Sequence, residues 1–321
     1  MYKKYYGLTR SPFGVSPDPY FFYPTSQHKE ALAVLHYGVL GQKGFVAVTG
    51  EVGTGKTLMV RCLLDALSRH RIAFAYVFNP RLSVTDFLSQ VLVDLGLPSP
   101  PKNKGEMLAV LSSFLMARSR QGAITALVVD EAQLLSWELL EEIRLLTNLE
   151  TSQHKLLQIV LVGQPELDRK LDSEELRQLK QRIGLRCHLQ PLTLKELHGY
   201  MHRRLELAGA NSHSAQIFRE DAIDAIHQHS SGIPRLVNTL AENCLIFGYG
   251  KQANPITPEI VREVAAELRL SAGGPKPADS GDDAEERRKI RKALLRMLDE
   301  LDGVSPKSIT DHKFQAGVET T

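Results

Sequence analysis

The stretch Gly50-Glu51-Val52-Gly53-Thr54-Gly55-Lys56-Thr57 constrains the fold more than any other part of the chain, because it matches the phosphate-loop pattern G-x-x-x-x-G-K-[ST] at every fixed position. The apolar run from Phe45 to Thr49 is typical of a buried parallel strand, and apolar residues recur at helical spacing from Leu58 to Leu67. With strand, glycine-rich turn and helix in this order, backbone N–H groups can converge at the positive end of the helix. The stretch therefore predicts an α/β fold that binds a nucleoside triphosphate. A chance glycine-rich turn is the alternative.

Individual side chains of this loop have expected roles. Lys56 would reach the β- and γ-phosphates, and the Thr57 hydroxyl would ligate magnesium. The other expected nucleotide contacts are Gly50, Glu51, Val52, Gly53, Thr54, Gly55 and Leu58.

A second apolar run, Ala126 to Val129, leads directly into the adjacent carboxylates of Asp130 and Glu131. Carboxylates at such a position are costly unless they serve a cation or a reaction. We expect Asp130 to hold magnesium, directly or through water, and Glu131 to orient or deprotonate the water that attacks the γ-phosphate. A surface turn after a strand is the alternative interpretation.

Polar residues also follow two further predicted strands. Asn79 comes after the run 72–78, and Gln164 comes at the tip of the run 156–163. In open α/β sheets, ligands bind at the carboxyl ends of the strands. Both residues are therefore candidate catalytic groups, with Gln164 sensing the γ-phosphate, although both precede a proline and could equally belong to turns.

Arginines give two further candidates. The stretch 176–186 carries Arg177, Lys180, Arg182 and Arg186 ahead of a short strand predicted around Cys187-His188-Leu189. One of these arginines could reach the nucleotide of another subunit, or the group could be a solvated basic face. Arg235 opens a later helix beside Pro234 and could fold back over the phosphates, although an arginine in a first helical turn is common.

The composition limits the class of protein. The 321 residues contain 39 Lys and Arg against 37 Asp and Glu, so the net charge does not indicate a nucleic-acid binder. A local basic patch is compatible with these totals. The three cysteines lack metal-ligand spacing and lie in apolar surroundings, which indicates reduced thiols and a cytoplasmic location. No run approaches the ~18 apolar residues of a membrane span, so membrane association would need a partner.

The order of predicted elements divides the chain into three parts. Residues 1–192 form the α/β part, with an N-terminal segment rich in aromatic residues and proline; residues 193–270 are helical. We expect the N-terminal segment to pack against the nucleotide domain near the adenine. The alternative is that its aromatic residues pack without contacting a ligand. A helix capped by Ser26 leads into the first strand. Residues 271–321 form a linker and a helix at 284–301, which either binds a protein partner or ends a mobile tail that is disordered after Gly303.

In combination, the loop 50–57, the Asp130-Glu131 pair and the stretch 232–235 resemble the Walker A, Walker B and sensor-2 motifs of an AAA+ ATPase. More narrowly, roughly residues 1–268 resemble the general secretion pathway protein A (ExeA-like) family. Further residues that carry this resemblance are Pro12-Phe13, Pro17-Asp18-Pro19, His28, Asp130-Glu131-Ala132-Gln133, Asn148-Leu149-Glu150-Thr151, Val162-Gly163-Gln164-Pro165-Glu166-Leu167 and Gln181-Arg182-Ile183.

The resemblance implies a P-loop NTPase (AAA+) parallel-sheet core with a C-terminal α-helical lid, ATP hydrolysis with Mg²⁺, and assembly into rings or filaments. It also implies that Arg182 acts as the finger and Arg235 as sensor 2. The chain departs from the family at Gln164, where many AAA+ proteins have Asn or Thr. Secretion members also carry a membrane span and a peptidoglycan-binding region after the ATPase, whereas a linker and one helix are expected here, so cell-wall binding is not expected.

Three functions are compatible with these features. The first is an ATP-driven oligomeric switch or assembly factor for secretion, pilus or exopolysaccharide export machinery. The second is a regulator of transposition that binds duplex DNA, since such regulators have a similar core. The third is a scaffold that binds ATP for structure and hardly hydrolyses it.

Overall fold

The computed structural model describes residues 1–14, 16, 18–78, 80–97, 102–151, 154–210 and 217–270. Asn79 and the predicted helix 284–301 lie outside the described residues. Within these ranges, no helix is both long and apolar enough to cross a lipid bilayer.

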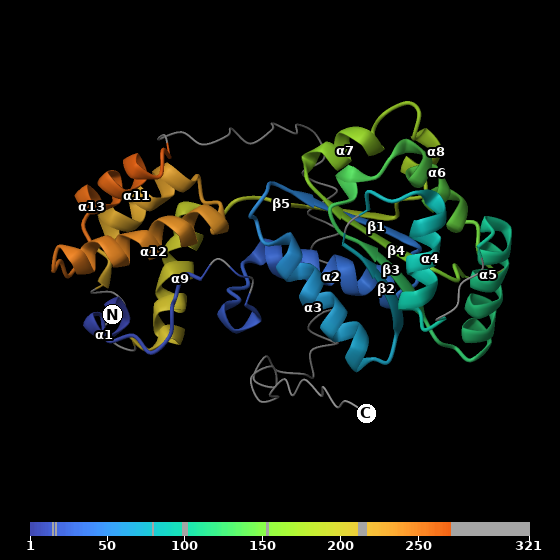
Figure 1. Cartoon of the computed structure of the whole chain (residues 1–321), viewed down its shortest axis with the longest axis horizontal. Helices are drawn as coiled ribbons and strands as arrows, with labels where there is room; N and C mark the ends of the chain where they lie inside the picture. The colour runs from blue at the N-terminus through green and yellow to red at the C-terminus, as the bar shows by residue number, and fades with distance from the viewer. Residues whose placement is uncertain are drawn as a thin grey trace. The chain divides into compact units, whose positions relative to one another are not determined.

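A five-stranded parallel sheet organises the first two thirds of the described chain (Figure 1). Its strands, in spatial order, are β2 (Ala73–Val77), β3 (Thr125–Val129), β4 (Gln158–Gly163), β1 (Phe45–Gly50) and β5 (Leu185–Leu189). The register pairs Val48 of β1 with Val162 of β4, and Val129 of β3 with Leu161. The carboxyl ends of β1, β3 and β4 therefore meet at one edge of the sheet, and the predicted α/β fold is confirmed.

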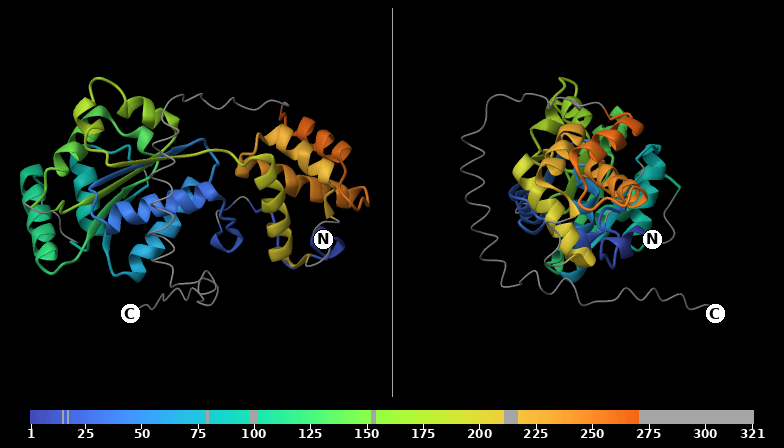
Figure 2. Two further views of the ribbon diagram at one scale, coloured as in Figure 1. Left: turned by 180° about the vertical axis from the view of Figure 1, so that it is seen from behind. Right: turned by 90° about the vertical axis from the view of Figure 1, so that its left-hand side faces the viewer.

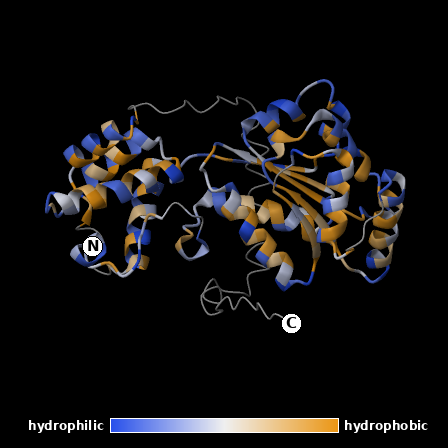
Figure 3. Ribbon diagram, viewed as in Figure 1, coloured by the Kyte–Doolittle hydropathy of each residue, from blue (hydrophilic) through white to orange (hydrophobic). Residues whose placement is uncertain are grey.

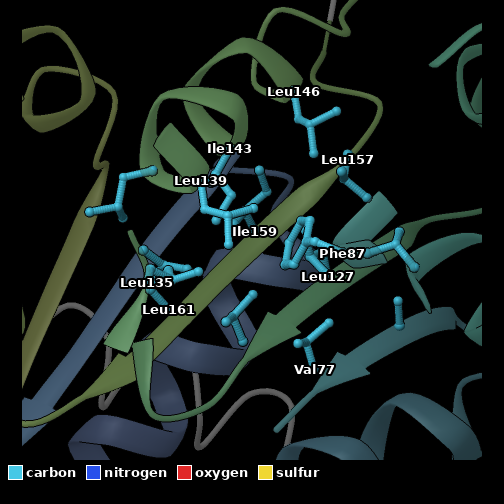
Figure 4. Packing of buried hydrophobic residues seen from close by; sticks show 14 of the residues in the cluster. Val77, Phe87, Leu127, Leu135, Leu139, Ile143, Leu146, Leu157, Ile159 and Leu161 are labelled. Atoms are coloured by element: carbon cyan, nitrogen blue, oxygen red, sulfur yellow. The ribbon is translucent and has the colours of Figure 1, made fainter. Parts of the chain in front are cut away.

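Helices cover both faces of this sheet, as Figures 1 and 2 show. On one face lie α2 (Ser26–Leu40) and α3 (Lys56–Arg69). On the other lie α4 (Val84–Asp94), α5 (Lys104–Arg120) and α6 (Trp137–Leu146). Alternate residues of a strand point to opposite faces, so Ile159 and Leu161 join the cluster beneath α4 and α6 (Figure 4), while Val160 and Val162 are buried on the opposite face.

The segment between β4 and β5 differs from the expectation. A helix that was not predicted, α7 (Pro165–Leu171), begins directly after Gln164, and the stretch 176–186 contains the short helix α8 (Arg177–Lys180). The strand predicted around Cys187-His188-Leu189 is confirmed as β5 (Leu185–Leu189), which follows a hydrogen bond from Gly184 N–H to Phe45 O at 3.0 Å.

The helical part contains α9 (Leu194–Leu205), the π-helical turn η3 (Glu206–Ala210), α11 (Glu220–Ser230), α12 (Pro234–Gly250) and α13 (Pro258–Glu267). Its helices bury a second hydrophobic cluster, which includes Leu197, Ile223 and Leu240. Apolar and polar residues alternate around these helices, whereas the strands of the sheet are apolar along most of their length (Figure 3). A capping box between Thr193 and Glu196 begins α9.

The N-terminal segment, with α1 (Tyr2–Tyr5) and η1 (Pro19–Phe21), contributes side chains to this second cluster. The cluster includes Tyr6, Leu8, Phe13 and Phe21, so the expectation that this segment packs against the nucleotide domain is wrong for these residues. The guanidinium of Arg204 on α9 explains part of the attachment: its Nε donates to Pro12 O at 2.6 Å, and it lies 4.9 Å from the centroid of the Phe21 ring. The cap of α2 is Thr25 rather than the expected Ser26.

Candidate active site at the carboxyl edge of the sheet

The phosphate loop connects β1 to α3 through two glycines with positive φ. Gly53 has φ 88°, and Gly55, with φ 104°, is the N-cap of α3. These are left-handed conformations that favour glycine. A Cβ on Gly53 would also lie 2.7 Å from the Cβ of Arg235. The loop therefore requires glycine for its backbone and for close approach, as the sequence predicted.

Lys56 lies inside this loop and is only 7% exposed. Its Nζ donates to the backbone oxygens of Gly50 at 2.6 Å and Glu51 at 2.9 Å. Burial lowers the pKa of Lys56, and the carboxylates of Glu131, Asp130 and Glu51 oppose that shift. A buried ammonium beside the first turn of α3 is the chemistry that suits a polyphosphate.

Asp130 follows β3 directly and is 4% exposed. Its carboxylate accepts hydrogen bonds from Glu131 N–H at 2.9 Å and from the Tyr76 hydroxyl at 3.3 Å. Burial and the Glu131 charge raise the pKa of Asp130, although the bond from Glu131 N–H opposes this. The Asp130 carboxylate oxygens are of the type that Mg²⁺ binds.

Glu131 has a left-handed backbone, with φ 52°, and its side chain is held by two glutamines. Its Oε2 accepts hydrogen bonds from Gln133 Nε2 at 2.6 Å and from Gln164 Nε2 at 3.2 Å. Gln133 Oε1 accepts in turn from Gln164 N–H at 3.0 Å. The structure thus brings Gln164 to Glu131, and it adds Gln133, to which the sequence analysis gave no role.

His28, on α2, is a further residue without a predicted role in the site. Its imidazole is buried, with Nδ1 at 2.8 Å from the Thr25 hydroxyl and Nε2 at 3.5 Å from Thr54 O. Burial lowers the pKa of His28. His28 therefore links the start of α2 to Thr54 of the loop, which sequence spacing alone could not show.

The two candidate arginines differ in position. Arg235 lies in the first turn of α12, and its N–H donates to Gly53 O at 3.2 Å, so the helical part touches the phosphate loop. Arg182 follows α8, where it lines a hollow of about 660 Å³ with Arg177, Gln178 and Gln181. Among the described residues Arg182 forms no salt bridge, whereas nearby Arg186 pairs with Asp172 at 3.0 Å.

The strand order, the loop after β1 and the paired carboxylates after β3 are those of the P-loop NTPase fold of the AAA+ class. A family model described as "AAA domain" matches residues 39–171. The chain thus contains an AAA domain and is similar to general secretion pathway protein A over most of its own length.

Three comparisons describe this relationship. General secretion pathway protein A of Aeromonas hydrophila is 42% identical over 258 residues, which cover 80% of this chain and 46% of that protein. The Mu-like prophage FluMu DNA transposition protein B of Haemophilus influenzae is 25% identical over 175 residues, covering 53% of this chain and 56% of that protein. The chain thus spans about half the length of each. Cdc6p from Pyrobaculum aerophilum shares the fold, with TM-score 0.60, 20% identity and coverage of 89% of this chain and 88% of that one.

Proposed function

We propose that this protein binds ATP with Mg²⁺, hydrolyses it, and acts as an oligomeric switch or assembly factor for secretion, pilus or exopolysaccharide export machinery. One observation carries the ATPase proposal: the buried Lys56 of the loop after β1 and the carboxylates of Asp130 and Glu131 after β3 lie at the same edge of the sheet. The 42% identity to general secretion pathway protein A supports the pathway part of the proposal.

The loop holds the triphosphate in this proposal. Backbone N–H groups from Gly50 to Leu58 donate to the phosphates at the positive end of α3, and the Lys56 ammonium leaves the carbonyls of Gly50 and Glu51 for phosphate oxygens. The Thr57 hydroxyl and the Asp130 carboxylate would hold Mg²⁺, which would supply positive charge to offset that of the phosphates.

Hydrolysis then depends on Glu131, which orients the attacking water and accepts its proton. Gln133 and Gln164 keep the Glu131 carboxylate in place through their amide groups. Gln164 also contacts the γ-phosphate. The presence of the γ-phosphate therefore affects the position of Glu131, the proposed base. Asn79 remains a candidate for the same edge of the sheet.

Two arginines couple the reaction to conformation. Arg235 folds over the phosphates from the first turn of α12, which already contacts Gly53 of the loop. Arg182 projects from the surface after α8 and reaches the nucleotide of a neighbouring subunit in a ring or filament. An arginine supplied in trans is worth about 10³–10⁵ in turnover in P-loop enzymes.

Glu131→Gln tests the ATPase proposal. The variant keeps the shape and one oxygen of the side chain but cannot accept a proton, so ATP affinity is retained and turnover falls by about a hundredfold or more. Glu138→Gln, at an exposed position in the first turn of α6, is the matched control and keeps full turnover. Rapid phosphate release by Glu131→Gln would remove Glu131 from this role. Negligible turnover by the wild-type protein would favour the scaffold function.

A regulator of DNA transposition is the second candidate, favoured by the identity to transposition protein B. It predicts affinity for duplex DNA that falls steeply with salt, because phosphate contacts release counterions. Two of the four basic residues near α8 weigh against a DNA-binding face there, since Lys180 and Arg186 both pair with Asp172, at 2.9 and 3.0 Å. Fluorescence anisotropy with labelled duplex DNA, at several salt concentrations with and without ATP, separates the two candidates.

Neighbouring genes test the pathway. Genes for secretion, pili or polysaccharide export beside this one support the first candidate. A neighbouring transposase gene supports the second.

A further inference from the structure

We propose that the helical part contains a second, separate metal site, which binds a divalent transition-metal ion of the zinc type through His198, His202 and Glu220. One ligand atom from each of these side chains lies within 4.8 Å of one from each of the others. The site lies between α9 and the first turn of α11, and its ligands are not among the residues proposed to bind ATP and Mg²⁺.

Helical periodicity explains why these side chains meet. His198 and His202 are four residues apart on α9, and Glu220 and Asp224 are four residues apart on α11. Residues with this spacing lie on the same face of a helix. Two imidazoles on one helix therefore face two carboxylates on the other, while Leu197 and Ile223 bury the adjoining faces in the hydrophobic cluster.

The distances suit a tetrahedral ion after a small adjustment. His198 Nδ1 lies 2.5 Å from Glu220 Oε2, and His202 Nε2 lies 3.4 Å from Glu220 Oε1. Zinc bonds of about 2.1 Å at tetrahedral angles separate neighbouring ligand atoms by about 3.4 Å. The distance between His202 Nε2 and Glu220 Oε1 already has this value. The distance between His198 Nδ1 and Glu220 Oε2 must increase by about 1 Å when bonds to a metal replace the hydrogen bond. Water or a further group completes the coordination.

Asp224 supplies the outer contact that such a ligand needs. Its Oδ1 lies 2.9 Å from His198 Nε2, on the side of the ring opposite Glu220. An Nε2–H donated to Asp224 fixes the tautomer in which the lone pair of Nδ1 is free for a metal. This arrangement, carboxylate to histidine to metal, is common at protein zinc sites.

The ligand types identify the class of ion. Imidazole suits zinc and neighbouring transition metals, whereas Mg²⁺ prefers oxygen ligands in octahedral geometry. The side chains of His198 and His202 are 24% and 27% exposed and that of Glu220 is 66% exposed, so an ion can reach them from solvent. A bound ion would fasten α11 to α9 and stabilise the helical part.

The competing explanation is a protonated His198 that forms ion pairs with Glu220 and Asp224 without any metal. The two explanations differ in the part played by His202. In the ion-pair network its nitrogen makes only the longer contact to Glu220, at 3.4 Å. In the metal site it is a ligand equal to the others, so its removal should affect metal affinity strongly.

Calorimetric titration of the tag-free, chelator-stripped full chain with ZnCl₂ tests the proposal. We expect one zinc ion per chain at this site, an increase in Tm with zinc, and at least a tenfold loss of affinity in both His202→Gln and Glu220→Gln. Asp224→Asn removes no ligand and should weaken binding about 10–100-fold. The exposed His70→Gln variant is the control and should bind as the wild type does. A melting curve without zinc verifies that each variant is folded.

Substitution with Co²⁺ gives an independent measurement on the wild-type chain. Tetrahedral nitrogen and oxygen ligands produce an intense visible d–d spectrum without thiolate charge-transfer absorption. The proposal is overturned if the wild type takes up no zinc, if His202→Gln and Glu220→Gln bind zinc as well as the wild type, or if thiolate absorption assigns the ion to a cysteine.

Discussion

The side-chain amide of Gln133 donates a 2.6 Å hydrogen bond to the carboxylate of Glu131. The two residues are brought together by the left-handed backbone at Glu131 and the turn η2 (Ala132–Leu134), which folds the chain back over the edge of the sheet. Gln133 is 8% exposed, and its Oε1 also anchors the backbone of Gln164. Gln133 is therefore a positioning residue for the proposed base.

Removal of this amide should lower turnover without weakening nucleotide binding. A hydrogen bond to a charged group is worth about 1.5–3 kcal/mol, so Gln133→Ala should reduce kcat by about ten- to a hundredfold. Steady-state phosphate release together with calorimetric ATP affinity measures the two effects separately, and Gln121→Ala at the exposed end of α5 is the control. Unchanged kcat, or an equal loss of kcat and of ATP affinity, would contradict a positioning role.

A matched pair of glycines tests the contact between the loop and the helical part. Gly53 and Gly96 have φ 88° and 87°, but an added Cβ would meet Arg235 at 2.7 Å in the first case and nothing within 4 Å in the second. Both alanine variants should lose about 1–2 kcal/mol of stability from the backbone alone. Only Gly53→Ala should also weaken ATP binding, by about tenfold or more, which corresponds to about 1.4 kcal/mol.

Chemical denaturation and ATP calorimetry on both glycine variants check this prediction. Equal ATP affinities in Gly53→Ala and Gly96→Ala would mean that the approach of Arg235 to the loop has no part in nucleotide binding.

Arg182 should act on a neighbouring subunit. Arg182→Ala should reduce turnover about 10³-fold while ATP affinity is retained. When mixed with Glu131→Gln subunits, it should regain activity, because those subunits have an intact Arg182 to supply to the active site of the other variant. Arg169→Ala, an exposed arginine paired with Glu166 on α7, is the control. The trans role is excluded if turnover per subunit is independent of protein concentration or if the mixture stays inactive.

His28 gives a prediction for pH. Burial lowers the pKa of His28, although the Thr54 carbonyl and Glu196 oppose the shift, so the unfolded chain binds this proton more readily than the folded one. The contribution of His28 to folding is therefore present above the ordinary pKa of about 6.5 and declines as the pH falls below it.

We expect the loss of Tm between pH 7 and pH 5 to be smaller in His28→Gln than in the wild type, whatever the absolute Tm of the variant. The exposed His70→Gln should keep the slope of the wild type. Parallel slopes for His28→Gln and the wild type, measured by thermal unfolding across this range, would show that burial does not lower the pKa of His28.

Sequence patterns predicted the sheet and the loop because both depend on local rules. The buried strands read as continuous apolar runs, and the glycines at 53 and 55 have the backbone that the loop pattern requires. Asp130 and Glu131 could be expected near the loop because the carboxyl ends of parallel strands lie at the same edge of a sheet. The structure therefore confirms the fold, while the roles of these residues remain predictions.

Features that depend on tertiary contact were missed. A turn was one of the two interpretations of Gln164 before Pro165, but a proline at the first helical position followed by Leu167 and Leu171 also indicates a short helix, which is α7. The sequence indicated that the N-terminal aromatic residues would be buried. It did not show that they would pack against the helical part. Neither the hydrogen bond of Gln133 nor that of His28 could be predicted, because each depends on side chains that a turn or a neighbouring helix brings together.

The most direct test of the account is isothermal titration of the folded protein with ATP, with and without Mg²⁺. The account predicts one ATP per chain, bound more tightly with Mg²⁺, and loss of that binding in Lys56→Ala, since the buried ammonium is the loop's only side-chain cation. Folded wild-type protein that binds no ATP in the presence of Mg²⁺, or Lys56→Ala that binds it as well as the wild type, would contradict the account.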